Sequence, residues 1–199
     1  MNTITNGQKL QNAYRACIEP YSAHLQIAVT LTLKSTARIS VKRFENYGNE
    51  RFNYLCHLDE ERLQSTVRYF NALLTKSLFG NQAKHKNKKE WAKPLVFTIV
   101  EGRNCNKKTH LHLAIGNIPS EHLSNIEPII KSAWARCDFA NRQIKVKHLT
   151  NASGWLNYIT KEVGYTDNDA LDIVSSTIPP FIQQSICVMT HHFLLRLGR

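Results

Sequence analysis

Two histidines in one short segment have the type and spacing to bind a cation. His110 and His112 are separated by one residue in THLHLAIG, residues 109–116, which has the apolar alternation of a β-strand. Side chains two residues apart point to the same face of a strand, so both imidazoles face the same way. Two neutral imidazoles so placed can share one divalent cation. On its own, this spacing is more often a pair of ordinary half-buried histidines.

A carboxylate is expected beside the histidine pair. PLVFTIVEG, residues 94–102, is a second apolar segment, and a short polar turn joins the two as in an antiparallel hairpin. If residues 102–109 form the loop, Glu101 lies directly across from His110 and diagonal to His112. Two nitrogens and one oxygen leave open positions on a metal for phosphate oxygens and water. The three side chains therefore predict a catalytic metal site.

A candidate nucleophile follows on a predicted helix over residues 154–163, with Ser153 as its cap and Gly164 at its end. The apolar stripe of this helix consists of Leu156, Ile159 and Val163. Tyr158 and Lys161 lie on the roughly opposite side, three residues apart. The phenol can attack a phosphate, and the ammonium can neutralise phosphate charge or favour the ionised phenol. Taken singly, an exposed tyrosine and an exposed lysine are common surface residues.

The composition bounds the kind of protein. Its 199 residues suit a single domain, and 26 Lys and Arg against 15 Asp and Glu give a formal net charge of +11. Such an excess attracts polyanions and predicts salt-sensitive binding to nucleic acid, although a basic protein without such a partner is the simpler alternative. Scattered cysteines without a CxxC pair fit a reducing cytoplasm. Because the sequence has neither a membrane-spanning run nor a signal peptide, we expect a soluble protein. It also lacks the phosphate-binding loop of a nucleotide-driven helicase, so any helicase that acts with it is expected to be a separate chain.

Basic residues near the predicted site are candidates for contacts with DNA. The predicted hairpin turn carries Arg103, Lys107 and Lys108. Lys145 and Lys147 share one face of a predicted strand over residues 143–149. Trp91, within the lysine-rich loop of residues 84–93, can stack on a base. Each residue alone is more simply a solvated surface group, so only their common charge favours a DNA path.

The remaining patterns predict an α+β fold with a central antiparallel sheet of about four or five strands flanked by helices. The further elements expected are a strand over 25–34, a helix over 59–79 ended by Gly80, a helix over 119–136 kinked or restarted at Pro128, and a terminal helix over 181–197. A fifth strand is not evident.

Three motifs in this order resemble the HUH endonuclease superfamily, particularly its rolling-circle replication initiator proteins. They are LTL at 31–33 in the first strand, HLH at 110–112, and YITK at 158–161. The resemblance covers roughly residues 25–165 and implies a single nicking domain with a ferredoxin-like palm. Residues 166–199 would form a C-terminal helical extension.

The resemblance implies a transesterification that depends on Mg²⁺ or Mn²⁺ held by His110, His112 and Glu101. Members of the superfamily differ in their third metal ligand, so the assignment of Glu101 as that ligand depends on the register of the predicted hairpin. Tyr158 would attack a scissile phosphate in single-stranded DNA or an origin hairpin, keep the 5′ phosphate, and free a 3′ hydroxyl that primes replication of a plasmid or phage. A separate helicase and polymerase would be partners. Tyr165 does not match the two-tyrosine spacing of some relatives and is taken as structural.

Other functions share parts of this pattern. A transposase or a plasmid-mobilising relaxase of the same superfamily would use similar chemistry. A DNA-binding module could have kept the fold and lost cutting, although retention of the histidines, Tyr158 and Lys161 argues against it. A histidine-triad nucleotide hydrolase needs a further histidine where this chain has Ala114, and would leave Tyr158 without a role.

Overall fold

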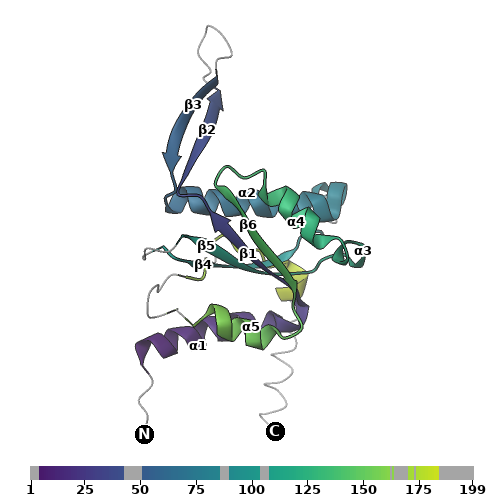
Figure 1. The fold of residues 1–199 in the computed structure, drawn as a ribbon. Helices are drawn as coiled ribbons and strands as arrows, with labels where there is room; N and C mark the ends of the chain where they lie inside the picture. The colour runs from purple at the N-terminus through teal and green to yellow at the C-terminus, as the bar shows by residue number, and fades with distance from the viewer. Residues whose placement is uncertain are drawn as a thin grey trace, which may run out of the picture.

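A four-stranded antiparallel sheet organises the chain, with helices on both of its faces (Figure 1). The computed structural model describes residues 5–42, 51–85, 90–103, 108–161, 163, 170–172 and 174–183. In spatial order the strands are β4 (Leu95–Glu101), β5 (His110–Gly116), β1 (Leu25–Leu33) and β6 (Ala140–His148). The α+β class with an antiparallel sheet, expected from the sequence, is therefore confirmed.

One face of the sheet packs against α2 (Glu60–Phe79) and α4 (Ile126–Trp134). Alternation along β1 supplies this face with Ile27, Val29 and Leu31, each at most 1% exposed. The two helices contribute aromatic rings to this cluster: Phe70 of α2 and Trp134 of α4 meet edge to face, with ring centroids 5.7 Å apart. This side holds the larger of the two apolar clusters.

The opposite face is covered by α1 (Asn6–Ile18) and α5 (Ala152–Ile159), which lie side by side below the sheet in Figure 1. A short 3₁₀ helix, η1 (Glu19–His24), leads from α1 into β1. The second apolar cluster lies here and includes Phe97 and Ile99 of β4 with Leu156 and Ile159 of α5. Because apolar residues fill both faces of β4, its sequence reads as a continuous apolar run.

The helix predictions were correct in part. α2 begins after Asp59, which accepts from the Arg62 amide, and ends at Gly80, whose φ of 53° suits glycine. A 3₁₀ helix, η2 (Gly80–Lys84), follows. The predicted helix over 119–136 is two helices, α3 (Ser120–Leu123) and α4, so Pro128 falls in the first turn of the second helix.

α5 differs from its prediction at both ends. Its cap is Asn151, whose side-chain oxygen accepts from the Gly154 amide at 2.8 Å, and Ser153 lies inside the helix. The prediction of Ser153 as the cap was wrong because Asn151, two residues earlier, already satisfies the free amide. The helix ends at Ile159, so Lys161 lies in the turn that follows; Gly164 lies outside the described residues.

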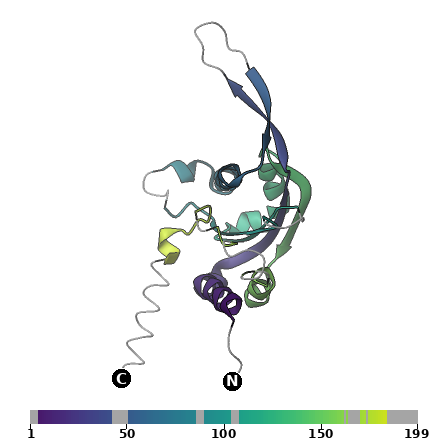
Figure 2. The same cartoon turned by 90° about the vertical axis from the view of Figure 1, so that its left-hand side faces the viewer.

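A two-stranded antiparallel ribbon was not anticipated from the sequence. It consists of β2 (Thr36–Lys42) and β3 (Arg51–His57) and projects away from the body of the protein (Figures 1 and 2). Ala37 and Cys56 at its base are buried in the larger apolar cluster. Further out, Tyr54 and Leu55 are 47% and 62% exposed.

The C-terminal segment takes the fifth position of the sheet. Thr177 and Val96 exchange two backbone hydrogen bonds of 2.8 Å, and the Val100 amide donates to Ala170 at 2.7 Å along the outer edge of β4. Ala170, Leu171 and Ile182 enter the second apolar cluster. The packed body thus extends past residue 165, and residues 170–172 and 174–177 are not helical.

The predicted terminal helix over 181–197 lies mostly outside the described residues. A helical turn begins at Pro180 and can be followed to residue 183. Across the part of the chain that the structure describes, no helix is both long enough and apolar enough to cross a bilayer.

Candidate active site

The β4–β5 pairing places the predicted metal ligands on one face of the sheet. Glu101 is directly opposite His110, and Ile99 is opposite His112, so the register deduced from the sequence is confirmed. Thr30 of β1 lies opposite His112 on the other side of β5. This face is the one that α1 and α5 cover.

His112 is held from both neighbouring strands. Its Nε2 lies 2.8 Å from Oε2 of Glu101, and its Nδ1 lies 3.2 Å from Oγ1 of Thr30. Only 6% of the residue is exposed. Two hydrogen bonds on opposite ring nitrogens fix the plane and the direction of the imidazole.

Burial determines the charge of His112. Desolvation lowers the pKa of His112 below its ordinary value, and it outweighs the hydrogen bond and negative charge of Glu101, which act in the opposite direction. The imidazole is therefore neutral near pH 7. Because a carboxylate oxygen only accepts, Nε2 of the neutral ring donates to Glu101 and Nδ1 accepts from the Thr30 hydroxyl.

His110 lies beside His112 without joining its hydrogen bonds. The two rings are parallel within 5°, with centroids 6.4 Å apart. Nδ1 of His110 is buried and has no hydrogen-bond partner among the described residues. Within those same residues, no group of three or more His, Cys, Asp or Glu side chains is arranged to hold a metal ion. The predicted trio thus comprises a hydrogen-bonded pair, Glu101 and His112, with a third ring next to it.

Tyr158 reaches this face of the sheet from α5. Its ring stands edge-on to His112, with centroids 6.2 Å apart and planes at 89°. Tyr158 is 55% exposed and lines a pocket at the surface. Nζ of Lys161 lies 4.4 Å from the centroid of the Tyr158 ring, a cation–π contact. The phenol therefore lies between a buried imidazole and an exposed ammonium.

The turn after α5 is fixed by α1. Nε2 of Gln11 donates to the backbone oxygens of Lys161 and Val163 at 3.0 and 3.1 Å. Nε of Arg15 donates to Oγ1 of Thr160 at 2.9 Å. These contacts hold the backbone that carries Tyr158 and Lys161, a role for α1 that the sequence did not indicate.

A pocket of about 350 Å³ opens in front of Tyr158. Its lining consists of Ala28, Thr30, His112, Lys145, Lys147, Trp155 and Tyr158. The two lysines are exposed and project from β6, opposite Thr30 and Ala28 of β1. They bring positive charge to the same side as the tyrosine. Trp155 was not among the residues predicted from the sequence, because its position follows from the helix packing.

The other predicted DNA contacts lie away from this pocket. Arg103 pairs with Glu60 at 3.0 Å and is 17% exposed, and Lys108 is exposed just before β5. Trp91 lies ahead of β4, at the end remote from Glu101, and stacks on Phe181 with centroids 4.8 Å apart. Lys107 and Tyr165 lie outside the described residues.

Comparisons with protein-family models, with curated proteins and with solved structures found no match to this chain.

Proposed function

We propose that the protein is a tyrosine-dependent endonuclease that nicks and rejoins single-stranded DNA at a replication origin. The observation that carries the proposal is the contact of Tyr158 with His112, at the point where His112 is bonded to Glu101. Residues from β1, β4, β5 and α5 meet there, although they are distant in the sequence. A nucleophile, a basic residue and a polar cluster in one place are what phosphoryl transfer requires.

Tyr158 supplies the nucleophile in this mechanism. Its phenolic oxygen forms a bond to the phosphorus of a backbone phosphate as the bond from phosphorus to the 3′ oxygen of the preceding nucleotide breaks. The phenol loses its proton, and the departing 3′ oxygen gains one from water. The products are a 5′ phosphate joined to tyrosine and a free 3′ hydroxyl. Attack by such a hydroxyl on the phosphotyrosine reverses the step and rejoins the strand.

Lys161 stabilises the charge that accumulates in this step. Its ammonium lies over the Tyr158 ring and is exposed, so it can contact both the phenolate and a phosphate oxygen. The contacts of Gln11 with the Lys161 turn keep the ammonium near the ring. Lys145 and Lys147, on β6, extend the positive surface along the path that the strand would follow.

His110, His112 and Glu101 are the residues that would hold a divalent cation. Nε2 of His112 and Oε2 of Glu101 are 2.8 Å apart. Neighbouring ligands of an octahedral ion with bonds of about 2.1 Å are about 3 Å apart, so the separation of this pair suits such an ion once the carboxylate turns off the Nε2–H axis. His110, whose buried Nδ1 has no partner among the described residues, would supply the third donor after these side chains turn, because as they stand the three are not arranged to hold a metal ion. When bound, the cation would polarise a phosphate oxygen.

Thr30 has a defined part in that arrangement. If His112 held a cation through Nε2, the hydrogen of the neutral ring would be on Nδ1. The Thr30 hydroxyl, 3.2 Å from Nδ1, then accepts where it previously donated. A hydroxyl can do both, which makes it a suitable partner for a metal-binding histidine.

A transposase or relaxase would use the same residues, and the choice of initiator rests on the motif resemblance. A binding-only module is the alternative from a different class. The exposure of Tyr158 and its place in the lining of a pocket that also contains Lys145 and Lys147 favour an enzyme.

The test is a nicking assay on a labelled single strand carrying a hairpin, with the purified full chain and Mn²⁺. We expect a shortened strand and a covalent complex between protein and DNA that survives denaturant. Tyr158→Phe should abolish both while Tyr69→Phe, on α2 and also half-exposed, should leave them unchanged. DNA binding without any covalent complex would contradict the nuclease proposal and would support a protein that only binds DNA.

A further inference from the structure

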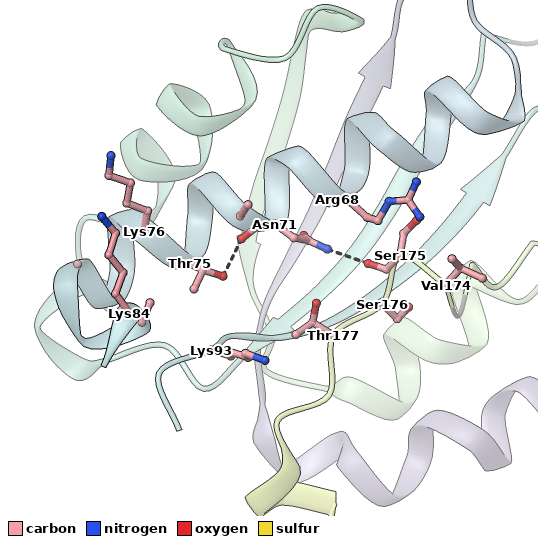
Figure 3. Close-up of a pocket in the computed structure, with 13 residues that line it drawn as sticks. Arg68, Asn71, Thr75, Lys76, Lys84, Lys93, Val174, Ser175, Ser176 and Thr177 are labelled. Carbon is pink, nitrogen blue, oxygen red and sulfur yellow. Dashed lines mark hydrogen bonds between the residues drawn. The ribbon is translucent and has the colours of Figure 1, made fainter. Parts of the chain in front are cut away.

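A second, larger pocket lies away from Tyr158, between α2 and the C-terminal segment (Figure 3). Its volume is about 570 Å³, within the roughly 300–1,000 Å³ of small-molecule sites. α2 and η2 form one wall, and residues 174–177, held along the edge of β4, form the other. None of its lining residues belongs to the candidate active site.

The lining of this pocket is strongly basic. Its four charged residues are Arg68, Lys76, Lys84 and Lys93. Figure 3 places Lys76 and Lys84 toward one end and Arg68 toward the other. Within the described part of the chain these cations form no ion pair, and the lining includes no carboxylate. Such an arrangement attracts an anion, because the positive charges are not neutralised by the protein.

Two deeply buried polar side chains, one from each wall, have atoms without a hydrogen-bond partner among the described residues. Asn71 is 7% exposed and Ser175 is 2% exposed. Nδ2 of Asn71 donates to the backbone oxygen of Ser175 at 2.8 Å, whereas Oδ1 of Asn71 and Oγ of Ser175 have no partner among the described residues. Both atoms have almost no accessible surface, so a ligand would contact them only after one of the two side chains turns toward the pocket.

The rest of the lining is small and in part apolar. The apolar part consists of Ala72, Gly80, Ala83 and Val174, together with the hydrocarbon stems of the basic residues, and the hydroxyl-bearing residues Thr75, Ser176 and Thr177 complete the lining. A fitting ligand therefore combines a negative group, a flat apolar surface and hydrogen-bonding groups. A fatty acid supplies the first two properties but has no hydrogen-bonding groups for the polar part of the lining. A nucleotide supplies all three.

We propose that this pocket binds the phosphate and base of a nucleotide, either free or as a unit of a nucleic-acid strand. The phosphate would contact the basic side chains, and the base would lie on the apolar residues with its hydrogen-bonding groups toward Thr75, Ser176 and Thr177. The site is independent of the Tyr158 chemistry and does not rest on the proposed nuclease function.

Calorimetric titration of the full chain with a deoxynucleoside 5′-monophosphate, the matching nucleoside and decanoate tests the proposal. We expect the monophosphate to bind at least about tenfold more tightly than the nucleoside, because charge-assisted hydrogen bonds to the phosphate are lost in the latter. The double variant Arg68→Gln, Lys93→Gln should bind the monophosphate about tenfold or more weakly than the unmodified protein does. Lys9→Gln combined with Arg142→Gln removes the same charge from exposed positions outside the pocket and should have little effect.

Equal affinity for monophosphate and nucleoside, equal losses in the two double variants, or a preference for decanoate would overturn the proposal. Thermal unfolding confirms that the variants are folded. Displacement of the monophosphate by a single-stranded oligonucleotide would identify the ligand as part of a strand, and failure to displace it would identify a free nucleotide; both uphold the site. Tyr158→Phe should bind the monophosphate normally, which separates this site from the nuclease proposal.

Discussion

The ring of Tyr158 stands perpendicular to the imidazole of His112, with centroids 6.2 Å apart, although 46 positions separate them in the chain. The contact exists because α5 packs Leu156 and Ile159 onto the sheet face that carries His112. A buried, neutral imidazole and an exposed phenol are thereby held together. The proposed nuclease mechanism depends on this relationship.

The hydroxyl group of Thr30 should matter for cation binding. Thr30→Val keeps the shape of the side chain and removes the oxygen that lies 3.2 Å from Nδ1 of His112. Loss of such a partner lowers metal affinity by about 10–100-fold. Mn²⁺ titration followed by electron paramagnetic resonance measures this, with Thr30→Ser as the control that retains the hydroxyl. Equal affinity of the Val and Ser variants would show that Thr30 has no part in the site.

Lys145 and Lys147 should contribute to the salt dependence of DNA binding. If each contacts one phosphate of a single strand, replacing both by glutamine lowers the slope of log K against log salt by about 1.4. Fluorescence anisotropy with a labelled oligonucleotide across a salt series gives the slope. Arg142→Gln, on the same strand and outside the pocket, is the control. An unchanged slope in the double variant would remove both lysines from the DNA path.

The position of Tyr158 should depend on the buried side of α5. Ile159 is 6% exposed, and Ile159→Ala is expected to lower the free energy of unfolding by about 2–5 kcal/mol because it leaves a cavity. Leu55→Ala removes a 62% exposed side chain of the ribbon and should change stability by less than about 0.5 kcal/mol. Urea denaturation compares the two. Similar losses would mean that α5 is not packed as described.

Cys137 should make stability fall at high pH. Burial raises the pKa of its thiol to about 12, whereas a thiol in the unfolded chain has a pKa near 8.5–9. Between about pH 9 and 12 the unfolded chain has therefore lost a proton that the folded chain retains, so stability decreases as pH rises. Cys137→Ala should flatten this dependence in denaturation at several pH values, and Cys17→Ala, at an exposed position, should not. If stability depended on pH in the same way in the two variants, the burial of the Cys137 thiol would not be the cause of the loss of stability at high pH.

Local patterns were sufficient to predict the central hairpin. The alternation around His110 and the short polar turn fixed the pairing of Glu101 with His110, because one register keeps the polar side chains together. α2 was equally readable, since its apolar residues recur at helical spacing and Gly80 ends it.

Long-range contacts were not predictable in the same way. α1 buries only Gln11 and Ile18, so it has little apolar pattern, and its role depends on hydrogen bonds to a turn 150 residues away. The pairing of Thr177 with Val96 also joins distant segments and leaves no local signal. In the site, the Thr30–His112 contact follows from the β1–β5 register, which neither strand specifies alone.

The most direct test is to identify the residue that becomes attached to DNA. The full chain is incubated with Mn²⁺ and a hairpin-bearing single strand, the DNA is digested to a short remnant, and the tryptic peptides are analysed by mass spectrometry. The nuclease mechanism predicts a phosphonucleotide remnant on Tyr158 and its loss in Tyr158→Phe. A remnant on another residue, or a cleaved strand with no modified peptide, would contradict it.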